Sequence, residues 1–417
     1  MASRWDAGDG IETPYSWLRL IIAILVGTIG GVGMWSVVVA LPAVQAEFGT
    51  GRGNASLPYT LVMFGVAVGG LFMGRMSDKR GIALPLMIGA VALGAGYALA
   101  ALSPNIWVFI IIHGVLIGAL GSSASFGPLM SNTSMYFSKH RGLAVALCAC
   151  GSYFAGAVWP KVVQYGIDHM GWRMTHVWIG LFCVVTLIPL ALLMRRRAPT
   201  QKPMGNPSAM ARDKGGLGLS PPLLQALLGI AGLGCCIAMA MPQVHLVAYC
   251  GDLGYGAARG AEMLSIMLGL GVISRTAGGF VADRFGSLFA LVLGSTMQGL
   301  ALTLFLFFDS LTSLYLISAL FGLFQGGIVP NYAVIVRDYF PAEEAGRRVG
   351  VVLMATLVGM AVGGWMSGAI FDLTGSYAMA FLNGLIFNLI NLVIVFGLVM
   401  RSGGLFAVYR LRGMKAV

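Results

Sequence analysis

The stretch from Ala261 to Gly286 reads A-E-M-L-S-I-M-L-G-L-G-V-I-S-R-T-A-G-G-F-V-A-D-R-F-G. It is apolar and long enough to cross a bilayer as a helix, which takes about 20 residues, yet it contains Arg275. A guanidinium keeps its proton at any working pH, so it cannot avoid the cost of the membrane by losing its charge. Charged side chains in spanning segments face a bundle interior or a watery cavity and mark the path of a ligand. The stretch therefore predicts a spanning helix with an anion anchor in its inner half.

Composition indicates an all-α membrane protein. The chain is 58% hydrophobic and 10% charged, with a mean hydropathy of +0.86, whereas about a quarter of the residues of a soluble domain are charged. The net charge of +11 comes from basic clusters at the ends of apolar segments, so it does not indicate nucleic-acid binding. The six cysteines lie in or beside apolar segments without C-x-x-C spacing. We expect them to pack, and we expect no metal and no cofactor.

Twelve apolar segments of spanning length follow one another along the chain. Their approximate cores are residues 18–44, 57–75, 83–102, 106–133, 142–166, 174–194, 222–249, 261–282, 287–308, 313–336, 349–371 and 377–400. One long polar stretch, rich in Pro, Gly and basic residues, separates six segments from six. The predicted organisation is a bundle over 1–194, a cytoplasmic linker over 195–219, and a second bundle over 220–417 that ends in a short basic tail.

The placement of lysine and arginine predicts the orientation. With the N-terminus inside, 21 of the 26 basic residues fall on the inner face, as the positive-inside rule requires. Four fall on the outer face, namely Arg52, Lys161, Arg173 and Arg259. Arg275 alone is left within the membrane. Both termini are therefore expected on the cytoplasmic side.

The two halves contain the same loop. G-R-M-S-D-K-R-G follows the second segment, and G-F-V-A-D-R-F-G follows the eighth. The paired positions are 205 residues apart: Gly74 with Gly279, Asp78 with Asp283, Lys79 with Arg284, and Gly81 with Gly286. Glycine permits close helix approach, and an aspartate can cap a helix and pair with nearby arginines. Two copies at equivalent places predict gating loops of a transporter repeat.

These features resemble the major facilitator superfamily over essentially the whole chain. Shorter motifs resemble its monocarboxylate porters and oxalate/formate antiporters: Y-F-S-K-H-R-G-L-A from Tyr136, G-S-Y-F-A-G-A-V-W-P from Gly151, M-P-Q-V-H from Met241, G-G-I-V-P-N-Y from Gly326 and G-G-W-M-S-G from Gly363. The resemblance implies a fold of two six-helix bundles, substrate binding between the halves, and alternating access. It also implies an arginine of segment eight that binds the substrate carboxylate, matched here by Arg275.

The residues themselves support this role for Arg275. The arginine lies about 14 residues, or about 21 Å, from the outer start of its helix, and its planar fork of donors matches a carboxylate. The twelve segments contain no clearly mid-membrane acid to pair with it. The animal porters carry an aspartate where this chain has Gly271, and the oxalate antiporters carry a lysine where it has Thr356. A single cationic anchor favours a monocarboxylate.

Three further residues are candidates for contact with the substrate. His245 follows Pro242 in segment seven and matches a P-x-x-H pattern of the related porters, which implies hydrogen bonding to the substrate or proton carrying. Asn331 and Tyr332 follow Pro330 in segment ten, and cavity-facing and packing roles are both open for them.

The predicted function is secondary active transport of small carboxylates, with lactate- or pyruvate-like acids moved together with a proton. Carboxylate exchange of the oxalate/formate kind and aromatic acid transport are the alternatives on the same fold. A transport-inactive sensor is the alternative of another class. No catalytic constellation is visible, so no enzyme is expected. The expected setting is a lipid bilayer, with multi-pass insertion of a monomer in a plasma membrane, and specifically a bacterial inner membrane.

Overall fold

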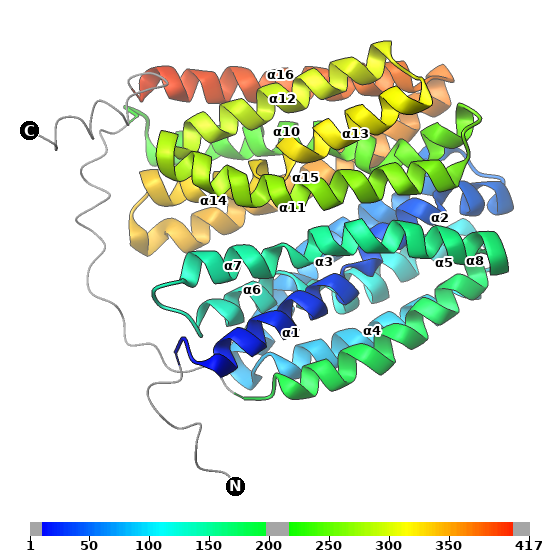
Figure 1. Ribbon diagram of the computed structural model, residues 1–417, viewed down its shortest axis with the longest axis horizontal. Helices are drawn as coiled ribbons and strands as arrows, with labels where there is room; N and C mark the ends of the chain where they lie inside the picture. The colour runs from blue at the N-terminus through cyan, green and yellow to red at the C-terminus, as the bar shows by residue number, and fades with distance from the viewer. Residues whose placement is uncertain (1–10, 197–216, 403–417) are drawn as a thin grey trace, which may run out of the picture. The chain divides into compact units, whose positions relative to one another are not determined.

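A computed structural model describes residues 11–196 and 217–402. Every regular element within these ranges is helical (Figure 1). Most of the predicted linker, the basic tail and both chain ends lie outside the described residues. The cytoplasmic location of the termini therefore stays a prediction.

The described residues form two compact units. Residues 11–50 and 55–196 make the first unit, and residues 51–54 and 217–402 make the second. The short segment 51–54 opens a helix whose remainder belongs to the first unit. The cytoplasmic linker over 195–219 between two functional bundles stays a prediction.

The first unit contains ten helical elements. They are α1 (Pro14–Gly30), α2 (Val32–Phe48), α3 (Arg52–Arg80), α4 (Ala83–Ala101), α5 (Ile106–Ile112), the π-helix η1 (His113–Gly121), the 3₁₀ turn η2 (Ser122–Ser125), α6 (Gly127–Ser134), α7 (Arg141–Ala149) and α8 (Gly151–Leu193). The six expected spans of this half are distributed over these elements.

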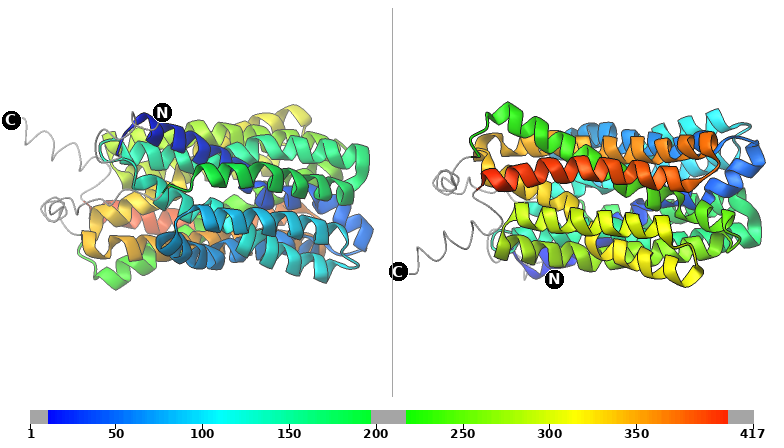
Figure 2. Two further views of the ribbon diagram at one scale, coloured as in Figure 1. Left: turned by 90° about the horizontal axis from the view of Figure 1, so that it is seen from below. Right: turned by 90° about the horizontal axis from the view of Figure 1, so that it is seen from above.

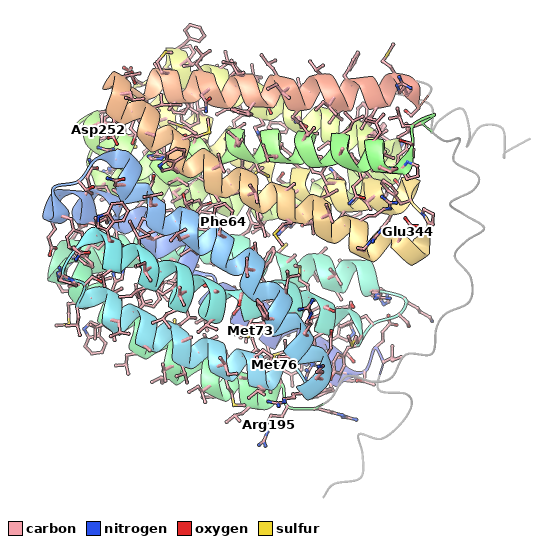
Figure 3. The ribbon with its side chains drawn as sticks, turned by 180° about the vertical axis from the view of Figure 1, so that it is seen from behind. Phe64, Met73, Met76, Arg195, Asp252 and Glu344 are labelled. Carbon is pink, nitrogen blue, oxygen red and sulfur yellow. The ribbon has the colours of Figure 1, made fainter. Side chains whose placement is uncertain are left out.

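The second unit contains seven helices. They are α10 (Pro221–Asp252), α11 (Ala257–Phe285), α12 (Ser287–Phe307), α13 (Leu311–Gln325), α14 (Ile328–Tyr339), α15 (Ala342–Thr374) and α16 (Tyr377–Arg401). The long helices of this unit run along a common direction, as the right-hand view of Figure 2 shows. Asp252 and Glu344 mark opposite ends of this unit in Figure 3.

When adjoining helical elements are joined, eleven helical stretches of the described chain are long and apolar enough to cross a membrane. The difference from the twelve expected segments arises in the stretch Arg141–Leu193, which is 53 residues long. A straight helix of that length would measure about 80 Å, against about 30 Å of hydrocarbon. The backbone instead turns at Gly171, whose φ of 76° and ψ of 161° are not helical. Figure 1 shows the chain reversing direction within α8, so this stretch holds both expected segments 142–166 and 174–194.

Glycines allow the helices of the second unit to pack backbone against backbone. A Cβ on Gly359 would stand 2.5 Å from the carbonyl oxygen of Leu233, and a Cβ on Gly363 would stand 2.6 Å from that of Ile237. These contacts join α15 to α10, so the small-xxx-small pair Gly359 and Gly363 serves close helix packing. The six cysteines are buried, which agrees with the packing role that the sequence predicts.

We expect Gly363→Ala to destabilise the protein by about 1–3 kcal/mol, because its methyl group would overpack the contact with Ile237. The measurement is the melting temperature of the detergent-solubilised protein. Gly397→Ala is the matched control, since Gly397 is exposed on α16 and no described atom lies within 4 Å of the place its added methyl group would occupy. Equal melting temperatures for the two variants would contradict the packing role of Gly363.

Candidate functional site

Arg275 lies on α11 beside the junction between α13 and α14. A Cβ on Gly322 would stand 2.1 Å from the carbonyl oxygen of Met267, and a Cβ on Gly326 would stand 2.2 Å from that of Gly271. From the first contact to the second, the residue number increases on segment ten and also on α11. The two helices are therefore parallel. This register places Arg275, one turn after Gly271, near the first turn of α14.

The junction itself is a break in what the sequence predicts as a single segment, 313–336. Helix α13 ends at Gln325 and α14 begins at Ile328. Gly327 fits against α11 at the break, where a Cβ would stand 3.2 Å from both the Gly278 Cα and the Ser274 carbonyl oxygen. The backbone N–H of Gly327 donates to the Ser274 hydroxyl at 3.3 Å. A side chain thus satisfies one of the backbone groups that the break leaves unpaired.

The first unit has a break at the equivalent place. Segment four changes from the π-helix η1 to the 3₁₀ turn η2 at Ser122, fourteen residues before Tyr136, and segment ten breaks after Gln325, fourteen residues before Tyr339. Interrupted helices at corresponding positions of two repeats are the strongest structural pointer to a transporter's binding site. The glycine and proline signals of these two breaks are G-S-S-A-S-F-G-P from Gly121 and Q-G-G-I-V-P from Gln325.

Helix geometry inclines the Arg275 side chain toward the N-terminal end of α11, and so toward the level of the break. Side chains on a helix lean toward its N-terminus, so the chain of Arg275 passes over the position one turn earlier, which is Gly271. Gly271 has no side chain to block it. Arg275 is half-buried, whereas Ser274 beside it is buried against the junction. The arrangement combines a permanent cation, a helix break and the N-terminal end of α14 in one region of the second unit.

Asn331 is a predicted candidate that lies at the level of this region. It lies in the first turn of α14 and is buried. The register of α11 against segment ten brings Arg275 and the start of α14 to the same level. Contact between Asn331 and a substrate stays a prediction.

His245 lies in a different set of contacts. It is fully buried, and both ring nitrogens have partners: Nε2 lies 2.8 Å from the Gly364 carbonyl oxygen and Nδ1 lies 3.1 Å from the Tyr377 hydroxyl. A carbonyl can only accept, so Nε2 carries the proton and Nδ1 of the neutral ring accepts from Tyr377. The histidine thereby connects α10 to α15 and α16.

The Tyr377 hydroxyl also contacts an ionic cluster within the second unit. Arg52 donates to it from Nη1 at 2.8 Å and donates to both carboxylate oxygens of Asp252 at 3.0 and 3.1 Å. Asp372 accepts from the backbone N–H groups of Arg52 and Gly53 at 2.7 and 2.8 Å. A carboxylate at the start of α3 is favourable because the helix N-terminus carries partial positive charge. This cluster was not predicted, since its members are far apart in the sequence.

Tyr332 belongs to a buried polar network of α10, α12, α14 and α16. Its hydroxyl donates to Asn391 Oδ1 at 2.7 Å, and Asn391 donates to the Ser295 hydroxyl at 2.8 Å. Gln298 extends the network by donating to the Cys235 carbonyl oxygen and to Asn388 at 3.1 and 3.3 Å. Polar side chains that pair between helices in this way hold a membrane bundle together. These contacts favour a packing role for Tyr332, and its contact with a substrate stays a prediction.

The predicted gating loops end their helices in the same way in both units. Gly81 follows α3 with φ of 85°, and Gly286 follows α11 with φ of 101°. Each backbone N–H bonds to the carbonyl four residues earlier, at 2.8 Å for Gly81 and 2.9 Å for Gly286. Only glycine adopts this left-handed backbone readily, so the paired glycines have the same physical cause.

The other loop positions face outward. The side chains of the four charged positions Asp78, Lys79, Asp283 and Arg284 are exposed. Gly74 and Gly279 have no described atom within 4 Å of the position of a Cβ. The expected close approach of helices at these two glycines is thus not made in this arrangement, and the gating role stays a prediction.

A helical membrane protein with an internal repeat, paired helix breaks and an intramembrane arginine is a transporter by class. The sequence profile of the Major Facilitator Superfamily matches residues 23–308 and 263–404. The chain belongs to this superfamily.

Among curated proteins, the chain is similar to monocarboxylate transporter 13 of Bos taurus, with 25% identity over 78% of this chain and 75% of the relative. It is also similar to the MFS-type transporter opdF of Penicillium oxalicum, with 27% identity over 71% of this chain and 69% of the relative. Among solved structures, a bacterial homologue of the human lysosomal transporter Spinster matches with a TM-score of 0.65 and 14% identity, over 96% of this chain and 98% of that one. This last likeness concerns the fold alone.

We expect Tyr377→Phe to lower the free energy of unfolding by about 1–3 kcal/mol, because His245 Nδ1 then loses its donor while buried. Thermal unfolding in detergent provides the measurement. Tyr255→Phe serves as the control, because Tyr255 is an exposed tyrosine of the same unit. A melting temperature of Tyr377→Phe equal to that of the control would show that the hydroxyl does not support the cluster.

Proposed function

We propose that this protein transports small monocarboxylates of the lactate and pyruvate kind together with a proton, by alternating access. The observation that carries the proposal is Arg275, a permanent cation within the spanning helix α11 and level with the helix break of segment ten. A fixed positive charge in the membrane is costly unless it serves an anion or a buried acid. A planar guanidinium suits one carboxylate.

The absence of a second anchoring cation at the segment-eleven position supports a singly charged substrate. Thr356 occupies that position, is buried, and donates its hydroxyl to the Leu353 carbonyl oxygen at 2.7 Å. It provides no positive charge. The similarity to a protein named monocarboxylate transporter 13 agrees with this choice of substrate class.

The contacts of His245 bear on the coupling. Both its nitrogens are committed to Tyr377 and Gly364, which favours a fixed hydrogen-bonding role over direct contact with the substrate. Proton coupling then needs only the carboxyl group of the substrate. The carboxylate is released from Arg275 when a proton neutralises it. The alternative mode of transport is the exchange of one carboxylate for another, with Arg275 binding each of them in turn.

The test is uptake of radiolabelled lactate into proteoliposomes, with and without an inward proton gradient. We expect gradient-driven uptake by the wild type. We expect Arg275→Ala to reduce it by at least about tenfold, since a hydrogen bond to a charged group contributes about 1.5–3 kcal/mol. Arg275→Lys should recover only part of the activity, because an ammonium lacks the bidentate fork.

Arg259→Ala is the matched control on the same helix, since Arg259 is exposed and pairs with Glu262 at 3.1 Å. It should transport like the wild type. Uptake that does not depend on the proton gradient but requires carboxylate inside the liposomes would establish exchange instead. Normal uptake by Arg275→Ala would refute the anchor, and absence of counterflow with every carboxylate would favour a sensor.

A further inference from the structure

Two buried glutamines meet near the break of segment ten. Gln243 Nε2, on α10, donates to Gln325 Oε1, at the end of α13, over 2.6 Å. Gln243 is 3% exposed and Gln325 is 0% exposed. The Nε2 group of Gln325 has no hydrogen-bond partner among the described residues. An amide N–H₂ left unpaired in a spanning bundle is costly, so its presence calls for an explanation.

The position of Gln325 relates it to Arg275. Gln325 is the last residue of α13, and the next residue, Gly326, packs directly on Gly271 and Ser274 of α11. The Arg275 side chain extends over Gly271 toward this level. The unpaired amide and Arg275 therefore belong to the same level of two packed helices.

The N-terminus of α14 lies at the same break. Helix α14 has twelve residues and begins at Ile328, and its N-cap residue Gly327 has no side chain that could accept from the N–H groups of the first turn. The backbone N–H groups of its first turn carry partial positive charge, which attracts anions. The unpaired Gln325 amide is an independent sign that a group with acceptor oxygens binds here.

We propose that Gln325 is the second, uncharged donor to the substrate carboxylate, beside Arg275, and that Gln243 positions it. This inference rests on the proposed function and names a further specificity-determining residue for it. A carboxylate offers about four lone-pair sites on two oxygens. Arg275 binds two of them through its fork, which leaves acceptor sites for the Gln325 N–H₂ group.

Gln243 determines the direction of the Gln325 amide. Because Gln243 donates to Gln325 Oε1, the oxygen of Gln325 is occupied and its nitrogen is left to the substrate. The reversed amide would place an oxygen against the anion, which is unfavourable. A neutral donor also adds binding without a second positive charge, which matches a substrate of one negative charge.

The test compares Gln325→Leu, Gln325→Glu and Gln325→Asn with the wild type in lactate counterflow at equal pH on both sides of the liposome membrane. We expect Gln325→Leu to raise KM about ten- to a hundredfold with little change in the maximal rate. Gln325→Asn should keep part of the affinity, because its shorter side chain still donates. Gln325→Glu should lose more affinity at pH 7.5 than at pH 5.5, since an ionised carboxylate repels the substrate and a protonated one can donate.

Gln298→Leu is the control, since Gln298 is equally buried but bonds to Cys235 and Asn388 in the other network. It should lower the melting temperature and leave KM unchanged. A purely structural role for Gln325 would likewise alter stability alone, with no shift in KM and no added pH dependence for Gln325→Glu. A KM of Gln325→Leu within twofold of the wild type overturns the inference.

A binding measurement separates this inference from the proposed function. The rise in melting temperature of the purified wild type is recorded with lactate, pyruvate, formate, oxalate and benzoate. A lactate response that is lost in Arg275→Ala and reduced in Gln325→Leu supports the inference. A response lost in Arg275→Ala but intact in Gln325→Leu overturns the inference alone. No response to any of these carboxylates overturns both.

Discussion

A backbone that crosses a bilayer has no water for its N–H and C=O groups, so each of them needs a partner within the protein. Most of the described chain meets this constraint by forming helices that apolar side chains surround. At one helix break a side chain supplies a missing partner. The Ser274 hydroxyl accepts the Gly327 N–H at the break of segment ten, and it lies directly beside Arg275.

The same constraint explains the glycines that matter most. Gly322, Gly326 and Gly363 bring one helix backbone against another, because lipid provides no hydrophobic drive for association and van der Waals contact must replace it. Gly81 and Gly286 serve a separate purpose, since their positive φ values reverse the chain after equivalent helices. Both uses need the absence of a Cβ, for different physical reasons.

Polar side chains in the second unit divide into two groups by their hydrogen bonds. The network of Tyr332, Asn391, Asn388 and Gln298 pairs its members with one another, so it leaves little capacity for a ligand. At the break, the Gln325 amide keeps an unpaired donor near a permanent cation. Function in a membrane bundle is expected where hydrogen-bonding capacity remains, and that criterion favours the Arg275 region over His245 and Tyr332.

The class of the protein, its spanning segments and its internal repeat could all be predicted from the sequence, and Arg275 stood out in it as the candidate anchor. These inferences follow from the local runs of hydrophobic residues and from the arginine within one of them, since a charge inside a membrane segment is costly. Which polar residues have partners was visible only in the folded chain. Gln243 and Gln325 are 82 residues apart, His245 and Tyr377 132, and Arg52 and Asp372 320. No local pattern encodes such pairs, because helix packing, and not sequence spacing, brings their side chains within hydrogen-bonding distance.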